Sequence, residues 1–222
     1  MKPILFNTKM VKAILSGRKT TTRRVFKDLK EFEIREDGFI QADISNKNGV
    51  YYFAGNIEEL SKQFSKYKVG DILYVRETWA NRCKVCDKEM CIGCSKKYSY
   101  KADGHYSDED KWKPSIHMPK EAARIFLKVK SVRVEKLQDI TEEGCLEEGI
   151  RKYTKDGELF KYSVNESMYK WQDMPKEPKE AFKDLWNSTL NKKTGWNYKY
   201  ENNPYVWVIE FEIISREEAF NE

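Results

Sequence analysis

The chain has 222 residues, 35% of them charged and 14% aromatic, with a formal net charge of +5. This length can bury one substantial core, so a single domain carrying insertions is the simplest organisation. The small net charge excludes overall basicity as a sign of a nucleic-acid partner, and only the local charge distribution can indicate one. We find neither the apolar core of a signal peptide nor the roughly twenty apolar residues of a membrane span, so we expect a cytoplasmic protein without a membrane partner.

Basic residues gather near the start of the chain. Residues 1–25 contain seven lysines and arginines and no acidic residue, whereas residues 26–65 contain five basic and eight acidic residues. The centre of this charge is "GRKTTTRR", residues 17–24, which follows an expected amphipathic helix over residues 8–16, with Thr8 as N-cap. Such a segment is a solvated polar strand, a basic contact for nucleic acid or a catalytic loop, and its charge bias favours a functional site.

A carboxylate lies within an apolar pattern further along the chain. The segment "VGDILYVRETW", residues 69–79, predicts a turn followed by a strand. In that strand Glu77 lies on the same face as apolar neighbours, among them Trp79. A buried carboxylate requires a cationic partner, and Arg24 or Arg76 is the natural candidate.

The second half of the chain contains further strands and two helices. A long strand is expected over residues 123–137, where a change of apolar phase near its middle indicates a β-bulge. A short acidic helix begins at Thr141 and ends at Gly149, another helix covers residues 178–190, and a closing strand covers residues 203–214. Strands outnumber helices and do not alternate with them, so we expect an α+β protein with a mixed, mostly antiparallel β-barrel and short flanking helices.

Three segments depart from this pattern and are expected to be insertions into the single domain. They cover about residues 26–65, 81–97 and 151–180. The first is acidic, the second contains a cysteine cluster, and the third is rich in lysine, glutamate and proline with scattered aromatic residues.

The cysteine cluster indicates a metal site. Four of the five cysteines follow the spacing C-x2-C-x4-C-x2-C, which in a reducing compartment indicates metal ligation. Four thiolates are the ligands that structural zinc prefers, so zinc is favoured over an iron–sulfur cluster and over free thiols. Such a closed site stabilises its loop and takes no part in catalysis. The expected ligands are Cys83, Cys86, Cys91 and Cys94, whereas Cys145 is interpreted as a buried apolar residue.

Five segments taken in chain order resemble the ASCH-domain family, in particular its longer bacterial and phage-encoded members. They are "GRKTTTRR", "VGDILYVRETW", "KWKPSIHMP", "DITEEGCLEEGI" and "PYVWVIEFEII". The resemblance implies the PUA-like fold, a small β-barrel with flanking helices that is related to RNA-binding modules. It covers residues 1–25, 66–80, 98–150 and 181–214 and leaves the three insertions outside.

The resemblance also implies catalytic roles. A small amidohydrolase of this family removes the acetyl group from acetylcytidine with a lysine and a threonine of its "GRKTxT" segment and a glutamate of the helix after the long strand. Matched by position, these roles fall on Lys19, Thr22 and Glu148, with Glu147 as a rival one position away. Lysine can act as the base if burial or nearby cations lower its pKa. An ideal strand would place Lys19 and Thr22 on opposite faces, so their cooperation requires a turn or bulge within residues 19–22.

Other residues are candidates for contacting the substrate. His117, between two prolines, is interpreted equally well as a structural histidine or as a residue for base recognition or proton transfer. Trp79 is a candidate for stacking on a base, although packing in the core is the more common use of tryptophan. The full set of candidate binding residues is Arg18, Arg23, Arg24, Arg76, Glu77, Trp79, Ser115 and His117.

Three functions remain as hypotheses. The first is an RNA- or nucleoside-interacting protein that hydrolyses an acyl amide of a modified cytidine. The second is a reader of RNA or modified bases without catalysis, and the third is a ribonuclease that uses Lys19 with His117 or Glu148. No catalytic cofactor is expected for any of them.

Overall fold

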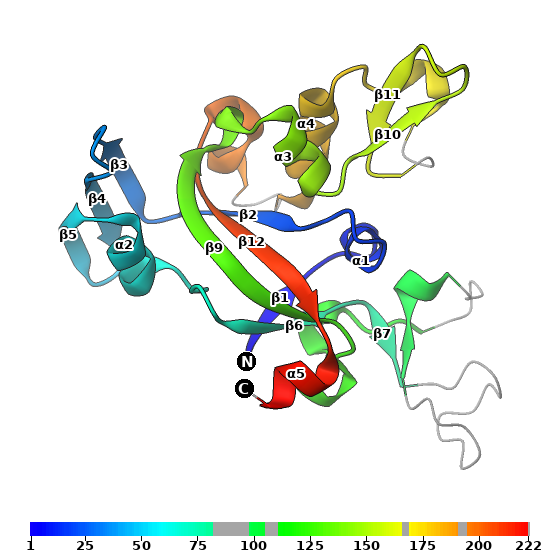
Figure 1. Ribbon diagram of the computed structural model, residues 1–222, viewed down its shortest axis with the longest axis horizontal. Helices are drawn as coiled ribbons and strands as arrows, with labels where there is room; N and C mark the ends of the chain where they lie inside the picture. The colour runs from blue at the N-terminus through cyan, green and yellow to red at the C-terminus, as the bar shows by residue number, and fades with distance from the viewer. Residues whose placement is uncertain (82–97, 105–110, 166–168, 191–194, 222) are drawn as a thin grey trace. The chain divides into compact units, whose positions relative to one another are not determined.

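The computed structural model describes residues 1–81, 98–104, 111–165, 169–190 and 195–221 (Figure 1). Helices take 32% and strands 35%, so the protein belongs to the α+β class, as predicted. Its largest sheet has five strands in the order β1-β6-β9-β12-β2. The β1–β6 pair is parallel, whereas β6 with β9 and β12 with β2 are antiparallel, so the sheet is mixed as expected. Within the described ranges the predicted closed barrel is not found, because β1 and β2 remain at opposite edges of this sheet.

The chain divides into two compact units, each assembled from distant segments. One unit consists of Met1–Gly17, Asp71–Lys128 and Ile213–Glu222, and the other consists of Arg18–Gly70 and Val129–Glu212. We call them the first and the second unit. The segment "GRKTTTRR" falls almost entirely in the second unit.

The first unit carries the two termini and the strand expected before Trp79, which ends at Arg76, so Glu77 lies between β6 and β7 and not within the predicted strand. Its strands are β1 (Lys2–Leu5), β6 (Ile72–Arg76), β7 (Trp79–Ala80), β8 (Ser99–Tyr100) and the beginning of β9 (Phe126–Lys136). Its helices are α1 (Thr8–Leu15), α5 (Arg216–Asn221) and the short 3-10 helices Lys101–Asp103, Ser115–His117 and Lys120–Ala122. An apolar core is formed by Ile72, Trp79, Met118, Ala122, Ala123, Phe126 and Ala219.

Local capping explains where α1 begins and ends. The side chain of Asn7 accepts a hydrogen bond from the backbone N–H of Met10 at 2.9 Å, so the N-cap is Asn7 and not Thr8 as predicted. Asparagine is at least as good an N-cap as threonine, and it begins the helix one residue earlier. Gly17 follows the helix with φ of +72°, the left-handed conformation that commonly ends a helix and that glycine adopts without strain.

The second unit carries the other part of the main sheet and the helices that pack near it. Its elements are β2 (Thr21–Val25), most of β9 and β12 (Tyr205–Ile214), α3 (Glu142–Glu147), α4 (Pro178–Thr189) and the 3-10 helices Leu137–Asp139, Trp171–Asp173, Trp196–Tyr198 and Tyr200–Asn202. Burial along β9 changes phase between Val129 and Val132, as the apolar pattern predicted. Thr141 caps α3 by accepting from the N–H of Gly144, which confirms the expected start of that helix.

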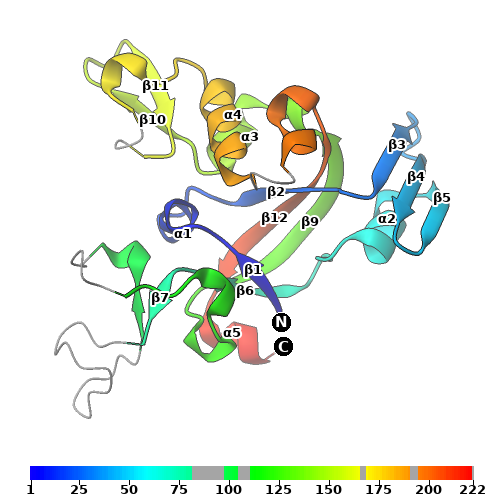
Figure 2. The ribbon, with the colours of Figure 1, turned by 180° about the vertical axis from the view of Figure 1, so that it is seen from behind.

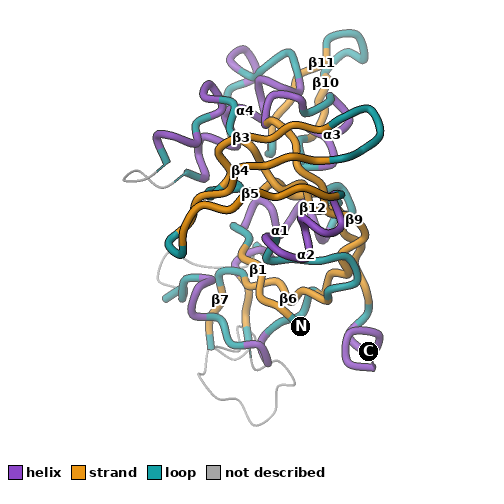
Figure 3. Tube along the Cα trace, turned by 90° about the vertical axis from the view of Figure 1, so that its left-hand side faces the viewer, coloured by secondary structure: helices purple, strands orange, loops and turns teal. Residues whose placement is uncertain are grey.

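Two smaller sheets complete the second unit. The antiparallel strands β10 (Arg151–Thr154) and β11 (Phe160–Ser163) form a hairpin beside α4 (Figure 2). The other sheet has the order β3-β4-β5 and is accompanied by a helix (Figure 3). Its elements are β3 (Leu29–Ile34), β4 (Ile40–Asn46), β5 (Gly49–Gly55) and α2 (Ile57–Phe64).

Candidate functional site

The candidate site begins with a lysine that the fold removes from water. The side chain of Lys19, just before β2, is 1% exposed. Its ammonium donates to Oε2 of Glu148 at 2.5 Å and to the Glu148 carbonyl at 3.0 Å. Glu148 follows the last turn of α3 as its C-cap. The two residues that the sequence proposed as partners are therefore in direct contact, although 129 positions separate them.

The structure also distinguishes Glu148 from its neighbour. Glu148 is buried, whereas the side chain of Glu147 is exposed. The backbone carbonyl of Glu147 accepts a hydrogen bond from the N–H of Thr20 at 2.9 Å, which joins the end of α3 to the start of β2. Of the two glutamates, Glu148 is the one that meets Lys19.

A second buried cation binds the same carboxylate. Arg23 of β2 donates from Nη1 to Oε1 of Glu148 at 3.2 Å and pairs with Glu135 through Nη2 at 2.7 Å. Its guanidinium also lies over the ring of Phe182 in α4, 5.8 Å from the ring centre. Glu148 thus bridges Lys19 and Arg23, and we call these three residues the buried charge cluster.

The cluster continues toward the surface through further ion pairs. Oε2 of Glu135 lies 3.4 Å from Nε of Arg133, and Arg133 also pairs with Glu210. Side-chain exposure rises along this chain, from 6% at Glu148 to 18% at Glu135 and 42% at Arg133. Sequence reasoning did not identify these outer residues, although strand alternation in "VRVE" places Arg133 and Glu135 on one face.

Burial changes the protonation equilibria at this site. It lowers the pKa of the Lys19 ammonium, an effect that Glu148 opposes and that Arg24 and Arg23 reinforce. Burial likewise lowers the pKa of Arg24, with Tyr67 and Glu148 acting in the opposite direction. A lysine with a lowered pKa gives up its proton more easily, which is the direction that a general base requires.

Strand alternation separates the threonines of "GRKTTTRR". Thr21 and Arg23 are two apart in β2 and share the face that meets Glu148, whereas Thr22 and Arg24 lie on the other face. Thr22 is buried and pairs with Ile209 of β12. Within the described part of the chain, the buried Oγ1 of Thr21 has no hydrogen-bond partner. Lys19 precedes the strand, but its ammonium bonds Glu148, the carboxylate that Arg23 also meets, so Nζ lies toward the Thr21–Arg23 face and away from the face of Thr22. The catalytic role of Thr22 stays a prediction.

Arg18 connects the candidate site to the β10–β11 hairpin. Its Nη1 donates to the carbonyl of Gly149 at 2.9 Å, immediately after Glu148. Burial lowers the pKa of Arg18, with Tyr153 of β10 acting against this shift and Arg151 adding to it. Arg18 therefore lies within electrostatic range of the first strand of the hairpin.

The partner of Glu77 differs from both predicted candidates. The Glu77 side chain is 1% exposed and accepts from Nε and Nη2 of Arg124 at 2.9 and 3.1 Å. Burial raises the pKa of Glu77, while the hydrogen bonds and charge of Arg124 oppose this rise. Arg76 is the adjacent residue along the chain and donates instead to the carbonyls of Met118 and Ile116. Arg124 reaches Glu77 because the N–H of Val75 bonds the carbonyl of Ile125.

The other predicted binding residues of the first unit have different surroundings. Trp79 is 4% exposed and belongs to the apolar core, with the Lys113 ammonium 5.0 Å from its ring centre. Ser115 and His117 lie in one 3-10 helix, where His117 is exposed. Arg76, Glu77, Trp79, Ser115 and His117 all belong to the first unit, whereas Arg18, Lys19, Thr22, Arg23, Arg24 and Glu148 belong to the second.

The expected zinc ligands cannot be placed. Cys83, Cys86, Cys91 and Cys94 lie outside the described residues, so the zinc site stays a prediction. In the part of the chain that is described, no three His, Cys, Asp or Glu side chains are grouped so that they could hold a metal ion. Cys145 is buried, as expected, and burial raises the pKa of its thiol to about 12.

Comparison of the chain with protein-family models, curated proteins and solved structures found no match. The family that the motifs resemble therefore remains an expectation from the sequence. No helix in the described ranges has the length and apolar character needed to cross a membrane.

Proposed function

We propose that the protein is a PUA-like protein of the ASCH type that interacts with RNA or nucleosides and hydrolyses an acyl amide of a modified cytidine such as acetylcytidine. The observation that carries this proposal is the buried contact between Lys19 and Glu148. The motif match selects these two residues from distant parts of the sequence, and a chance match would not be expected to select a bonded pair.

In this proposal, Lys19 first transfers its proton to Glu148 and then acts as the base. The resemblance assigns the attack on the acyl carbon to the Thr22 hydroxyl, whose proton passes to Nζ of Lys19, and Arg24 stabilises the oxyanion. Because Thr22 lies on the β2 face opposite the one that meets Glu148, this step requires residues 19–22 to rearrange. The bond from the acyl carbon to the exocyclic nitrogen then breaks, and that nitrogen receives the proton from Lys19. Water hydrolyses the threonine ester, so acetylcytidine and water give cytidine and acetate. The lowered pKa of Lys19 supports this assignment.

Acetate release from acetylcytidine tests the proposal directly. We expect turnover by the unaltered protein and a loss of roughly a hundredfold or more in Lys19→Met, the usual contribution of a general base. The exposed Lys27 provides the matched control, because Lys27→Met makes the same chemical change away from the cluster. Circular dichroism must show that Lys19→Met is folded. No acetate from the unaltered protein, or equal rates in a folded Lys19→Met variant, would contradict the hydrolase.

One observation favours a second candidate function, a reader of RNA or modified bases without catalysis. The side chains of Lys19, Arg23 and Glu148 are 1%, 2% and 6% exposed and satisfy one another. A fully paired cluster can serve to shape a binding surface without performing chemistry. Binding of the modified nucleoside without acetate release would identify the reader, whereas cleavage of RNA that Lys19→Met abolishes would identify a ribonuclease.

A further inference from the structure

The β10–β11 hairpin combines exposed basic side chains with aromatic rings. The Lys152 ammonium lies 3.7 Å from the centre of the Phe160 ring, and the Arg151 guanidinium lies 5.0 Å from that of Tyr153. The Lys155 ammonium lies 5.1 Å from the ring of Trp171, in the 3-10 helix after the hairpin. The three cations are exposed and the three rings are partly exposed. Basic and aromatic groups are therefore interleaved along this hairpin.

The two faces of the hairpin have different roles. Lys161 and Ser163 of β11 are buried, and the Lys161 ammonium donates to the carbonyls of Trp171 and Gln172 at 2.8 and 3.0 Å. By the strand register this mostly internal face also carries Arg151 and Tyr153, so that pair lies outside the proposed surface. Since side chains alternate along a strand, Lys152 and Phe160 lie on the opposite face, which is the one available to a partner.

We propose that this outer face, together with the exposed Lys155 that follows β10 beside Trp171, binds single-stranded RNA. The inference rests on the proposed RNA- or nucleoside-directed function and names the form in which the substrate arrives. In this arrangement the Lys152 ammonium leaves the Phe160 ring to contact a phosphate group, a base takes its place on the ring, and Lys155 contacts a second phosphate. Interleaved cations and aromatic rings are the combination that single-strand binders use, because the cations follow the backbone and the rings accept any base.

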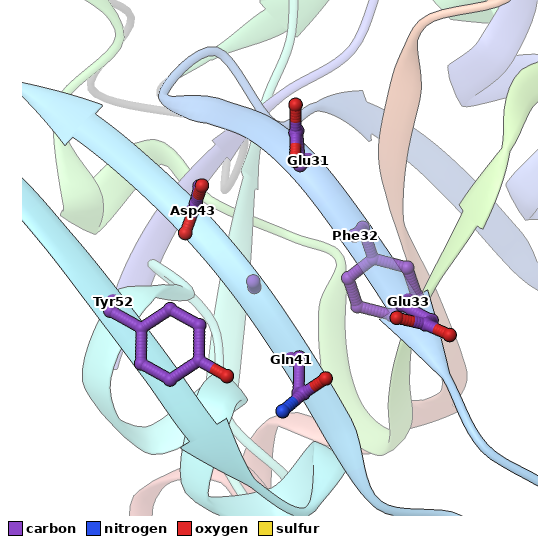
Figure 4. A pocket seen from close by; sticks show the side chains of 7 residues that line it. Glu31, Phe32, Glu33, Gln41, Asp43 and Tyr52 are labelled. Atoms are coloured by element: carbon purple, nitrogen blue, oxygen red, sulfur yellow. The ribbon is translucent and has the colours of Figure 1, made fainter.

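Charge distinguishes this hairpin from the other sheet of the second unit. A shallow pocket of about 240 Å³ lies on β3, β4 and β5, and Glu31, Glu33 and Asp43 are among the residues that line it (Figure 4). These carboxylates would repel RNA phosphates. The hairpin has acidic residues at its turn, where Asp156 accepts from the backbone N–H groups of Glu158 and Leu159. RNA is therefore expected along the strands as far as Lys155, the first residue of the turn, and not at the acidic residues that follow it.

The hairpin also continues directly from the candidate catalytic pair. Strand β10 starts three residues after Glu148, and Arg18, the residue before Lys19, donates to Gly149 between them. A strand of RNA held on the hairpin would therefore lie close to the part of the chain that carries Glu148. This proximity makes a modified cytidine within RNA, and not only the free nucleoside, a substrate that fits the second unit.

The proposal is tested with a labelled single-stranded oligoribonucleotide of about 16 nucleotides. Its binding is measured by fluorescence anisotropy over a range of salt concentrations. The double variant Lys152→Gln/Lys155→Gln should bind more weakly. The slope of the logarithm of the binding constant against the logarithm of the salt concentration should become about 1.4 less steep, because two phosphate contacts are lost. Phe160→Ala should weaken binding by roughly fivefold to a hundredfold without changing the salt dependence, and Phe160→Trp should restore it. Lys27→Gln/Lys30→Gln removes the same charge from exposed residues elsewhere and should bind like the unaltered protein.

The proposal is overturned if a folded Lys152→Gln/Lys155→Gln variant binds the oligonucleotide as tightly as the unaltered protein does. It is also overturned if duplex RNA binds as tightly as single-stranded RNA, or if single strands do not bind at low salt. Thermal denaturation shows that each variant is folded. Acetate release from free acetylcytidine is measured separately. Acetate release without RNA binding would refute only the hairpin surface, whereas variant-dependent RNA binding without acetate release would refute only the hydrolase.

Discussion

Replacement of Glu148 by glutamine is expected to destabilise the protein strongly. The change removes the carboxylate that lies 2.5 Å from the Lys19 ammonium and 3.2 Å from Arg23. The side chains of both cations are at most 2% exposed, so water cannot replace the lost charge. Removal of one partner of a buried ion pair costs roughly 3–5 kcal/mol. Arg23 retains Glu135 at 2.7 Å, so most of the cost comes from Lys19.

The opposite change, Lys19→Met, should cost less. Glu148 then keeps Arg23, and the substitution removes an ammonium whose lowered pKa shows that its surroundings disfavour the charged form. The double variant should be more stable than the sum of the two single effects predicts, with a coupling of about 0.5–3 kcal/mol, because methionine leaves no buried ammonium without a carboxylate. This order of stability follows from one carboxylate serving two cations.

Urea denaturation monitored by tryptophan fluorescence gives the free energies of unfolding. At about 2–4 °C per kcal/mol, Glu148→Gln should lower the melting temperature by roughly 6–20 °C. A Glu148→Gln variant within about 1 kcal/mol of the unaltered protein, or one more stable than Lys19→Met, would refute the reasoning, because 3–5 kcal/mol is the cost for a buried pair.

A comparison of the unaltered protein with Lys19→Met reports the protonation of Lys19. Because burial lowers its pKa in the folded state, the unfolded chain binds more protons than the native protein in the pH window between the lowered value and about 10.4. Stability should therefore rise with pH through that window in the unaltered protein. Lys19→Met lacks this contribution, so the difference in stability between the two proteins should shift toward the unaltered protein as the pH rises.

Three further outcomes are expected. Arg124→Met should destabilise the protein by roughly 3–5 kcal/mol at neutral pH, because buried Glu77 loses the guanidinium that pairs with it. The loss should be smaller in acid, where Glu77 is protonated, and urea denaturation at both pH values measures the difference. Cys145, whose pKa burial raises to about 12, should escape alkylation at pH about 8 in the folded protein and react after denaturation, as peptide mass spectrometry would show. Protein purified without chelators should contain stoichiometric zinc bound by the cysteines of residues 83–94, and the absence of both zinc and iron by elemental analysis would contradict the metal loop.

Local signals in the sequence predicted the helices well. Thr141 and Gly149 flank α3 as expected, because a side-chain cap and a left-handed glycine act within a few residues of the helix end. The apolar stripe of α4, with Phe182 and Trp186, is buried for a similar reason, since helical periodicity reports one face directly. The predicted N-cap of α1 was wrong by one residue, because two good capping residues, Asn7 and Thr8, are adjacent there.

Long-range pairing could be predicted only where a motif supplied it. The contact of Lys19 with Glu148 followed from matching two segments to one family pattern, whereas Arg124 was missed as the partner of Glu77. Strand alternation shows that Glu77 needs a cation, but the order of the strands decides which cation arrives. The same lack of information about strand order explains why an expected barrel was found as an open sheet.

The burial of "GRKTTTRR" changes the meaning of its positive charge. The sequence suggested a basic contact for nucleic acid, yet Lys19 and Arg23 are buried against Glu148, and Arg18 donates to a backbone carbonyl. A buried guanidinium that already binds two carboxylates is poorly placed to neutralise a phosphate of an RNA backbone, because phosphates remain hydrated at the surface. If the protein binds RNA, cations outside this segment must hold the backbone. Exposed Lys152 and Lys155 meet that requirement, and in the proposed hydrolase the cluster around Glu148 is then reserved for the base.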